Sequence, residues 1–358
     1  MNELFTFDDV LIAPSFSDIR SRKEVSTSVE YGDAKLTLPV ISANMDTVTG
    51  ESMANALASE GAVGCLHRFV PIEENLVIYG RCMFPNGYGP AISIGLGKYE
   101  LERAEALVNV GATNVVVDVA HGAQMAVVEQ VKELRALLGD KIFITVGNFA
   151  TSDSIKDFRH ALTTSNRVDY YKVGVGPGSA CTTRLKTGIG VPQLSAIIDC
   201  VRTGEHIIAD GGMRTPGDVA KALGAGAKLV MLGGMLAGTN ETPGKLIGPG
   251  SLITDIPKGI SSAMLEDRYW KVYRGSASKE SYEAQGKDSS YRTAEGESFI
   301  VPSKGPVKVV LDDLSGGLRS SMTYVGARNL TEFKRYCVFN RITGNTVKEN
   351  GAHGKPVV

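Results

Sequence analysis

Eight short apolar runs recur between residues 38 and 233, and a segment with helical periodicity separates each run from the next. Several runs are continuously apolar rather than alternating, which is typical of strands covered on both faces of a parallel sheet. Eight strand–helix repeats predict an α/β fold of the (β/α)8 TIM-barrel type, which occupies about 250 residues. An open, doubly wound sheet is the alternative. The predicted strands span residues 38–44, 62–67, 91–96, 114–119, 142–147, 170–175, 206–210 and 228–233.

The segments between the runs carry helix signals. Apolar side chains recur at three- and four-residue steps over residues 127–138, and Gly139 follows as a C-cap. In a later segment Thr215 is a candidate N-cap, Pro216 suits the first helical turn, and Gly224 is expected to end the helix.

Two segments fall outside this alternation. Residues 69–90 form a connection too short for an inserted domain, so we predict one domain over residues 1–358 with no inserted regulatory domain. Residues 270–305 are polar, rich in Gly and Ser, and poor in large aliphatic side chains. A long segment of this composition predicts a mobile active-site lid.

Composition excludes several classes of partner and site. The 38 basic and 39 acidic residues give a net charge of -1, so neither nucleic acid nor an anionic membrane is an expected partner. The apolar runs are too short to span a bilayer and the N-terminus is acidic, which predicts a cytoplasmic protein. Five scattered cysteines without a CxxC pair argue against a disulfide framework and a structural zinc site.

Polar and glycine residues follow the predicted strands where a barrel has its active site, at the C-terminal ends. They are Asn44 and Asp46 after the first strand, His67 and Arg68 after the second, Asp118 after the fourth, Asn148 after the fifth, residues 210–212 after the seventh and residues 233–235 after the eighth.

The loop after the sixth strand, "GVGPGSACTTR" (174–184), presents Cys181 among glycines. Backbone amides and Arg184 are expected to lower the pKa of the thiol and make it a nucleophile. The alternative is a small buried apolar residue, as most free cysteines are. No His or Asp stands beside it in sequence as a protease partner. A thiolate that attacks an electrophilic ring carbon, with oxidation or reduction of the adduct, needs no such dyad.

Two further groups at the rim suggest a nucleotide ligand. Backbone amides after the sixth, seventh and eighth strands form a candidate phosphate cradle, although each glycine pair alone is equally consistent with a turn. Asp118 and Asp210 each end an apolar strand and suit the diols of two riboses; the alternative for each is a helix cap. The candidate cradle residues are Ser179, Gly211, Gly212, Gly233 and Gly234.

Three other residues are candidate acid–base groups. His67 and His121 lie near the rim, where a histidine that only binds ligand is at least as consistent. Glu295, in the predicted lid, is expected to move a proton only when the lid is closed; otherwise it is a solvated surface residue.

The motifs "VGVGPGSACTTR", "NMDTV" (44–48), "DVAHG" (118–122), "ADGG", "GDVAKALGAGA" and "VMLGGMLAG" together resemble the family of IMP dehydrogenases and GMP reductases. The resemblance covers nearly the whole chain and implies a (β/α)8 barrel, usually as a homotetramer. The short 69–90 connection, "YRTAEG" (291–296) and "TYVGARNL" (323–330) resemble the reductase branch, whereas "YRGSAS" (273–278) and "GGMRTPGD" (211–218) are closer to the dehydrogenases.

The reductase reading implies that Cys181 attacks carbon 2 of GMP, that Thr183 and Glu295 manage the proton for departing ammonia, and that NADPH reduces the covalent intermediate to IMP. One alternative is an IMP dehydrogenase lacking the regulatory module, which oxidises IMP to XMP with NAD; Arg274 or Arg292 beside Thr183 would favour it. A second alternative is a catalytically silent purine-nucleotide-binding protein.

The same resemblance implies a set of site residues. Those for GMP or IMP are Met45, Ser179, Asp210, Gly211, Gly212, Gly233, Gly234, Gly275, Ser276, Ala277, Arg292 and Gly296. Those for the cofactor are Arg68, Asp118, Val119, Ala120, Val175, Gly176, Tyr291 and Arg292, with Ser21, Arg22 and Ser321 from a neighbouring subunit. Those for a monovalent cation, K⁺, are Gly176, Gly178, Cys181 and Arg184.

Overall fold

The computed structural model describes residues 3–162, 166–249, 251, 265, 268–280, 293–344, 346 and 349–350. Eight parallel strands close into a barrel in which each strand pairs with the next along the chain and the last pairs with the first. Each predicted run overlaps one of these strands, which confirms the (β/α)8 prediction and excludes the open sheet. The strands are β4 (Val40–Ser42), β5 (Val63–Leu66), β6 (Ala91–Ile94), β7 (Asn114–Asp118), β8 (Phe143–Phe149), β9 (Tyr170–Val173), β10 (Ile207–Asp210) and β11 (Leu229–Leu232).

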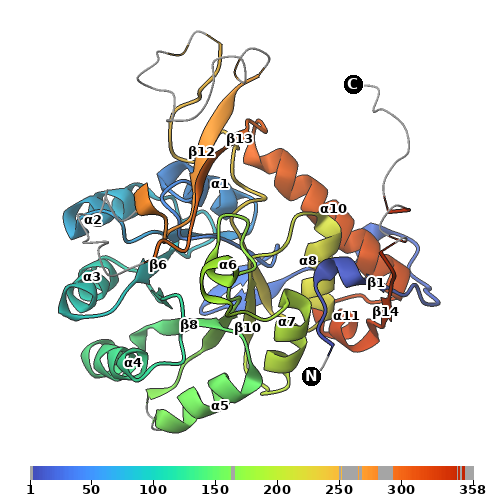
Figure 1. Ribbon diagram of the computed structural model, residues 1–358, viewed down its shortest axis with the longest axis horizontal. Helices are drawn as coiled ribbons and strands as arrows, with labels where there is room; N and C mark the ends of the chain where they lie inside the picture. Colours follow the sequence, from blue (N-terminus) through green and yellow to red (C-terminus); the bar gives the residue numbers. More distant parts are fainter. Residues whose placement is uncertain are drawn as a thin grey trace.

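Helices surround this barrel (Figure 1). The predicted caps are largely confirmed: Gly139, at φ 61°, ends α4, and the Thr215 hydroxyl accepts the Asp218 amide at the start of α8. Helix α8 includes Gly224 and reaches its C-cap one residue later, at Ala225. The helices are α1 (Glu51–Ser59), α2 (Ile72–Arg81), α3 (Lys98–Asn109), α4 (Met125–Leu138), α5 (Ser152–Ala161), α6 (Thr183–Thr187), α7 (Gln193–Val201), α8 (Pro216–Gly224), α10 (Val307–Val325) and α11 (Leu330–Tyr336).

The connection at residues 69–90 is one helix, α2, with short loops, and it returns the chain directly to β6. The prediction that no domain is inserted there is confirmed. In the part of the chain that the structure describes, no helix combines the length and the apolar character needed to cross a membrane.

A hairpin made of β2 (Val29–Tyr31) and β3 (Ala34–Leu36) closes the N-terminal end of the barrel. Its Tyr31 is fully buried, and the phenol oxygen lies 3.2 Å from the Thr145 hydroxyl inside the barrel. The Gly32 amide donates to the Tyr170 phenol at 2.8 Å. Because this end is filled, the opposite end of the strands is left for ligands.

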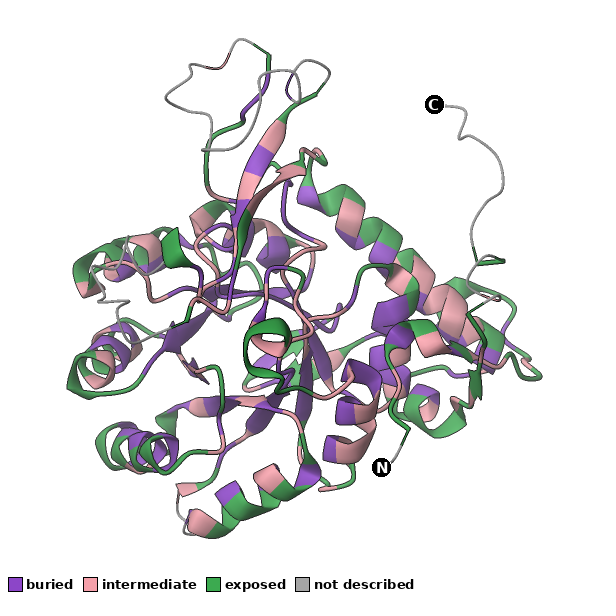
Figure 2. Cartoon of the chain, in the orientation of Figure 1, coloured by how far each residue is buried: buried purple, intermediate pink, exposed green. Residues whose placement is uncertain are grey.

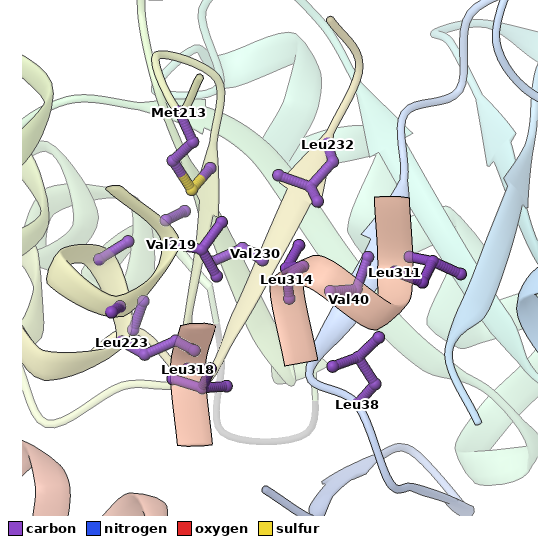
Figure 3. Packing of buried hydrophobic residues seen from close by; sticks show 14 of the residues in the cluster. Leu38, Val40, Met213, Val219, Leu223, Val230, Leu232, Leu311, Leu314 and Leu318 are labelled. Carbon is purple, nitrogen blue, oxygen red and sulfur yellow. The ribbon is translucent and has the colours of Figure 1, made fainter. Parts of the chain in front are cut away.

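Helix α10 packs its apolar face against α8 and the barrel wall. Leu311, Leu314 and Leu318, at three- and four-residue steps, are buried against Val40 and Val230 of the strands (Figure 3). Figure 2 shows the same division over the whole fold, with buried residues on the strands and on the inner faces of the helices.

The predicted lid begins and ends in strands. Strands β12 (Trp270–Arg274) and β13 (Ser298–Pro302) pair antiparallel and project from the barrel at the top of Figure 1. A second pair, β1 (Val10–Ile12) and β14 (Phe339–Arg341), joins the two ends of the chain. Short 3-10 helices occur at Phe7–Asp9, Arg22–Glu24 and Gly139–Lys141.

Candidate active site

A cavity of about 1290 Å³ opens at the C-terminal ends of the barrel strands. A site for one drug-sized ligand is usually about 300–1,000 Å³, so this cavity is larger than one such ligand needs. Predicted residues from all parts of the rim line it together: Met45, Arg68, Asp118, Val119, Ala120, Val175, Gly176, Gly178, Ser179, Cys181, Thr183, Arg184, Asp210, Gly211, Gly212, Gly233, Gly234, Gly275, Ser276, Ala277, Glu295 and Gly296. Tyr291 and Arg292 lie outside the described residues.

Cys181 is the half-buried first member of a chain of three side chains. Its Sγ lies 3.2 Å from Thr183 Oγ1, and that hydroxyl donates to Glu295 Oε2 at 2.7 Å. Glycines after β9 allow the loop to turn, and Thr183 begins α6. The arrangement offers a thiol a path for its proton to a carboxylate, because a hydroxyl can accept and donate at once.

The backbone on both sides of Glu295 is fixed against the cysteine loop. The Thr182 amide donates to the Glu295 carbonyl at 2.8 Å, and the Glu297 amide donates to the Ala180 carbonyl at 2.9 Å. The Glu295 amide also bonds the Ala277 carbonyl, at 3.1 Å. The end of the predicted lid is therefore docked, and its carboxylate faces the cysteine loop.

The other four cysteines are structural. Cys65 and Cys200 are buried in β5 and α7, and burial raises the pKa of both thiols. Cys82 and Cys337 follow α2 and α11, where burial raises the pKa of each to about 12. These thiols stay protonated at neutral pH, as expected for small apolar residues.

The loops of the candidate phosphate cradle lie close together at the cavity wall. Gly211 and Gly212 both have φ near +83°, which favours glycine. A Cβ on Gly234 would stand 2.7 Å from Ser179 Oγ, so the loops after β9 and β11 approach too closely for a side chain.

Tyr273 of β12 also lines this part of the cavity, and it was not among the residues predicted for the site. It is 3% exposed, and burial raises the pKa of its phenol, which stays a neutral donor. Tyr273 begins the motif "YRGSAS" (273–278), but nothing in that pattern marked its phenol as part of a ligand site.

Asp118 and Asp210 share one buried lysine. Lys172 Nζ lies 2.8 Å from Asp118 Oδ1 and 2.6 Å from Asp210 Oδ2, and it also donates to Asn148 Oδ1. Burial alone would lower the pKa of Lys172, but the attraction of the two carboxylates raises it overall. Lys172 could not be recognised from the sequence because it is a single charged residue within the apolar run "YYKV".

Arg68 and His67, which follow β5, lie in different surroundings. The Arg68 guanidinium stacks over the Phe69 ring at 5.0 Å and borders the cavity beside Asp118. His67 is buried outside the cavity lining; its Nδ1 accepts the Phe69 amide, and burial lowers its pKa to about 4. His67 is neutral at pH 7, so the structure does not support it as a catalytic acid.

The three residues predicted for a neighbouring subunit do not line this cavity. Ser21 caps the 3-10 helix at Arg22–Glu24, and Ser321 lies on α10. Arg319 of α10 donates to the Val25 carbonyl and joins the two segments. Their part in a second subunit's site stays a prediction.

The cysteine loop also holds the predicted cation residues. Carbonyl oxygens are ligands that suit K⁺. The Arg184 side chain cannot ligate a cation; its Nε donates to the Val175 carbonyl at 3.2 Å and a terminal nitrogen donates to Val191. Among the described residues, no cluster of His, Cys, Asp or Glu side chains could hold a metal. The Gly178 carbonyl accepts the Cys181 amide at 3.0 Å. The cation role of the Gly176, Gly178 and Cys181 backbone oxygens stays a prediction.

Residues 4–353 match the family model described as "IMP dehydrogenase / GMP reductase domain". The chain belongs to this family. The predicted membership in a family of oxidoreductases is thereby confirmed. A GMP reductase from Vibrio cholerae is 35% identical over 360 residues, which cover 98% of this chain and 97% of that protein.

Two solved structures of the family resemble the fold closely. A cysteine-to-alanine variant of GMP reductase from Trypanosoma brucei, in complex with guanosine 5'-monophosphate, has a TM-score of 0.86 at 29% identity and covers 99% of both chains. An IMP dehydrogenase from Legionella pneumophila has a TM-score of 0.80 at 42% identity over 96% of this chain and 99% of that one.

One side chain bears on the difference between the two branches of the family. Arg274 pairs with Asp46 through Nε and a terminal nitrogen, with Nε 2.9 Å from Asp46 Oδ2, and its amide bonds the Thr47 hydroxyl. It is thus held by the loop after β4 while Glu295 occupies the position beside Thr183. The other candidate, Arg292, lies outside the described residues.

Proposed function

We propose that this protein is a GMP reductase, which converts GMP to IMP and ammonia with NADPH through a covalent bond between Cys181 and the purine. The observation that carries the proposal is the hydrogen-bonded chain from Cys181 through Thr183 to Glu295. A carboxylate at the end of that chain serves proton transfer to a leaving amine, which the reductase reaction requires and simple nucleotide binding does not.

The Cys181 thiol passes its proton through Thr183 to Glu295, and its sulfur adds to carbon 2 of guanine. Glu295 returns this proton to the amino group, which departs as ammonia and leaves the purine bonded to sulfur. A hydride then joins carbon 2, the carbon–sulfur bond breaks, and the thiolate takes up a proton from solvent. The sum consumes GMP, NADPH and one proton and yields IMP, ammonia and NADP⁺. Covalent catalysis divides a steep barrier at a poor electrophile into smaller ones.

The residues present fit a nicotinamide cofactor beside the purine. The cavity has room beyond one nucleotide, and on that side Asp118 offers a carboxylate for a ribose diol while Arg68 offers a cation. When bound, the cofactor supplies the hydride. The residues that would hold it are Arg68, Asp118, Val119, Ala120, Val175 and Gly176, completed by Tyr291, Arg292 and, in a homotetramer, by a neighbour's Ser21, Arg22 and Ser321.

The nucleotide would bind with its phosphate on the amides after β10 and β11, beside Ser179 and Tyr273. Asp210 would accept the ribose hydroxyls, and Met45 with Ser276 would border the base. A K⁺ ion on the carbonyl oxygens of the cysteine loop would hold that loop in the shape that presents Cys181.

A dehydrogenase without the regulatory module is the second candidate, and the 42% identity with the Legionella enzyme favours it. That reaction needs an activated water where the reductase needs a departing amine. The pairing of Arg274 with Asp46 argues against it, because this arginine is engaged away from Thr183. A silent nucleotide-binding protein would have no need of the Thr183–Glu295 bond.

Absorbance of the reduced nicotinamide band in two mixtures tests the proposal. With GMP and NADPH we expect absorbance to fall and ammonia to appear, and Cys181→Ala to abolish both. A rise with IMP and NAD, and no reaction in the first mixture, would establish the dehydrogenase. Silence in both, with tight nucleotide binding, would establish the binding protein.

A further inference from the structure

We infer that Lys172 is a positioning residue that couples the nucleotide site to the cofactor site through the two carboxylates it shares. The inference rests on the proposed function, in which Asp210 serves the nucleotide and Asp118 the cofactor. The two aspartates end strands β10 and β7, and the lysine projects between them from β9.

Lys172 has no donor left for a ligand of its own. An ammonium has three N–H groups, and here they serve Asp118 Oδ1, Asp210 Oδ2 and Asn148 Oδ1. The side chain is 2% exposed, so water cannot readily replace any of these partners. Lys172 therefore acts on ligands through the carboxylates and not by touching them.

Amide groups complete the cluster and fix which oxygens remain available. Asn44 Nδ2 donates to Asp118 Oδ2 at 3.0 Å, and Asn148 Nδ2 donates to Asp210 Oδ2 at 3.0 Å. Both bonds to Asp210 end on Oδ2, so within the described part of the chain Oδ1 is the oxygen left for a ribose hydroxyl. The cluster thereby orients Asp210 toward the cavity.

The charges make the two carboxylates interdependent. The Asp118 and Asp210 carboxylates, 19% and 20% exposed, share the enclosed Lys172 ammonium, and Coulomb interactions are stronger at such a partly buried site than in bulk solvent. If Asp118 loses its charge, Lys172 is attracted to Asp210 alone and competes with the ribose for that carboxylate. If Lys172 loses its charge, Asp118 and Asp210 repel each other. The sign of Asp118's effect on nucleotide binding thus depends on Lys172.

Calorimetric titration of GMP, without cofactor, tests this in wild type, Asp118→Asn, Lys172→Met and the double variant. In wild type, Asp118→Asn should weaken GMP binding about fivefold or more, within the usual range of site-to-site coupling. In the Lys172→Met background the same substitution should tighten binding, because it relieves the repulsion. Lys271→Met is the matched control: Lys271 is also a buried lysine, bonded to the Asn240 and Thr242 carbonyls, and its loss should leave the weakening by Asp118→Asn unchanged.

The inference is overturned if Asp118→Asn changes GMP affinity in the same direction in both backgrounds, or by less than twofold in wild type. The second criterion stands even if Lys172→Met does not fold. Failure of the proposed function shows in a different measurement, because absorbance would then not fall in the mixture of GMP and NADPH, whether or not GMP binds.

Discussion

Replacement of Glu295 by glutamine tests the proton path most sharply. The substitution removes a proton acceptor and keeps the size of the side chain. The backbone of Glu295 is held by bonds to Thr182 and Ala277 that do not involve the side chain, so the residue should stay in position. A glutamine oxygen can still accept the Thr183 hydroxyl, but it cannot take the proton.

The size of the fall in kcat distinguishes two roles of Glu295, positioning of the Thr183 hydroxyl and acceptance of the proton. A hydrogen bond to a charged group is worth about 1 kcal/mol more than one between neutral groups, so weaker positioning of Thr183 accounts for about a fivefold loss. General acid–base catalysis contributes about 10²- to 10⁴-fold, or about 3–5 kcal/mol. We therefore expect kcat to fall at least about 100-fold with a small change in KM for GMP.

The assay is steady-state oxidation of NADPH, repeated with cofactor deuterated at the transferred position. In the variant, loss of ammonia should limit the rate, so the deuterium isotope effect on kcat should approach unity. Glu297→Gln, at an exposed site two residues along, is the matched control and should stay within about twofold of wild type. A Glu295→Gln enzyme within fivefold of wild type would refute the proton path.

Three further outcomes are expected. Gly234→Ala should raise KM for GMP at least about tenfold, because the alanine methyl group would meet Ser179 Oγ inside the cradle. An unchanged KM would show that the phosphate does not bind at this position. Urea unfolding should show that His67 makes the protein about 2 kcal/mol less stable at pH 5 than at pH 7. The histidine takes up a proton in the unfolded chain below its ordinary pKa of 6.5, whereas in the folded protein its pKa is about 4 and it stays neutral. His67→Asn should lack this contribution, and an equal change of stability with pH in both proteins would contradict it. Leu314 of α10 is fully buried in the apolar cluster, so Leu314→Ala should cost about 2–5 kcal/mol of unfolding free energy; a cost below about 1 kcal/mol would contradict the packing.

The barrel could be predicted because buried parallel strands appear in the sequence as short, continuously apolar runs. Strands such as β7 and β11 are apolar on both faces. Asp118 ends β7 and Gly233 follows β11, and both residues interrupt the apolar pattern where the site begins. The β2–β3 hairpin escaped notice although Gly32 and Asp33 form a two-residue turn between short alternating strands. Each of these strands has only three residues, too few for periodicity to stand out.

Side-chain partnerships over long sequence separations could not be predicted from residue patterns. Thr183 and Glu295 are 112 residues apart, and only the resemblance to a family joined them in advance. No family motif named Lys172, and its meaning depends on two carboxylates that converge only when β7, β9 and β10 close the barrel. Arg274 shows that a residue pattern can also suggest a role that the contacts do not support. The sequence made it a candidate water-activating group beside Thr183, but its guanidinium pairs with Asp46.

The mass of the protein after incubation with IMP and NADP⁺, followed by an acid quench, tests the central claim most directly. In a reductase, IMP and NADP⁺ run the hydride step in reverse and form the bond between Cys181 and the purine. Because no ammonia is present to displace the sulfur, the purine stays bonded to the enzyme. We predict that the peptide containing Cys181 gains the mass of IMP less two hydrogens, with one reduced cofactor formed per site and no XMP. Continuous formation of reduced cofactor with accumulation of XMP would contradict the account, as would the absence of any adduct on Cys181.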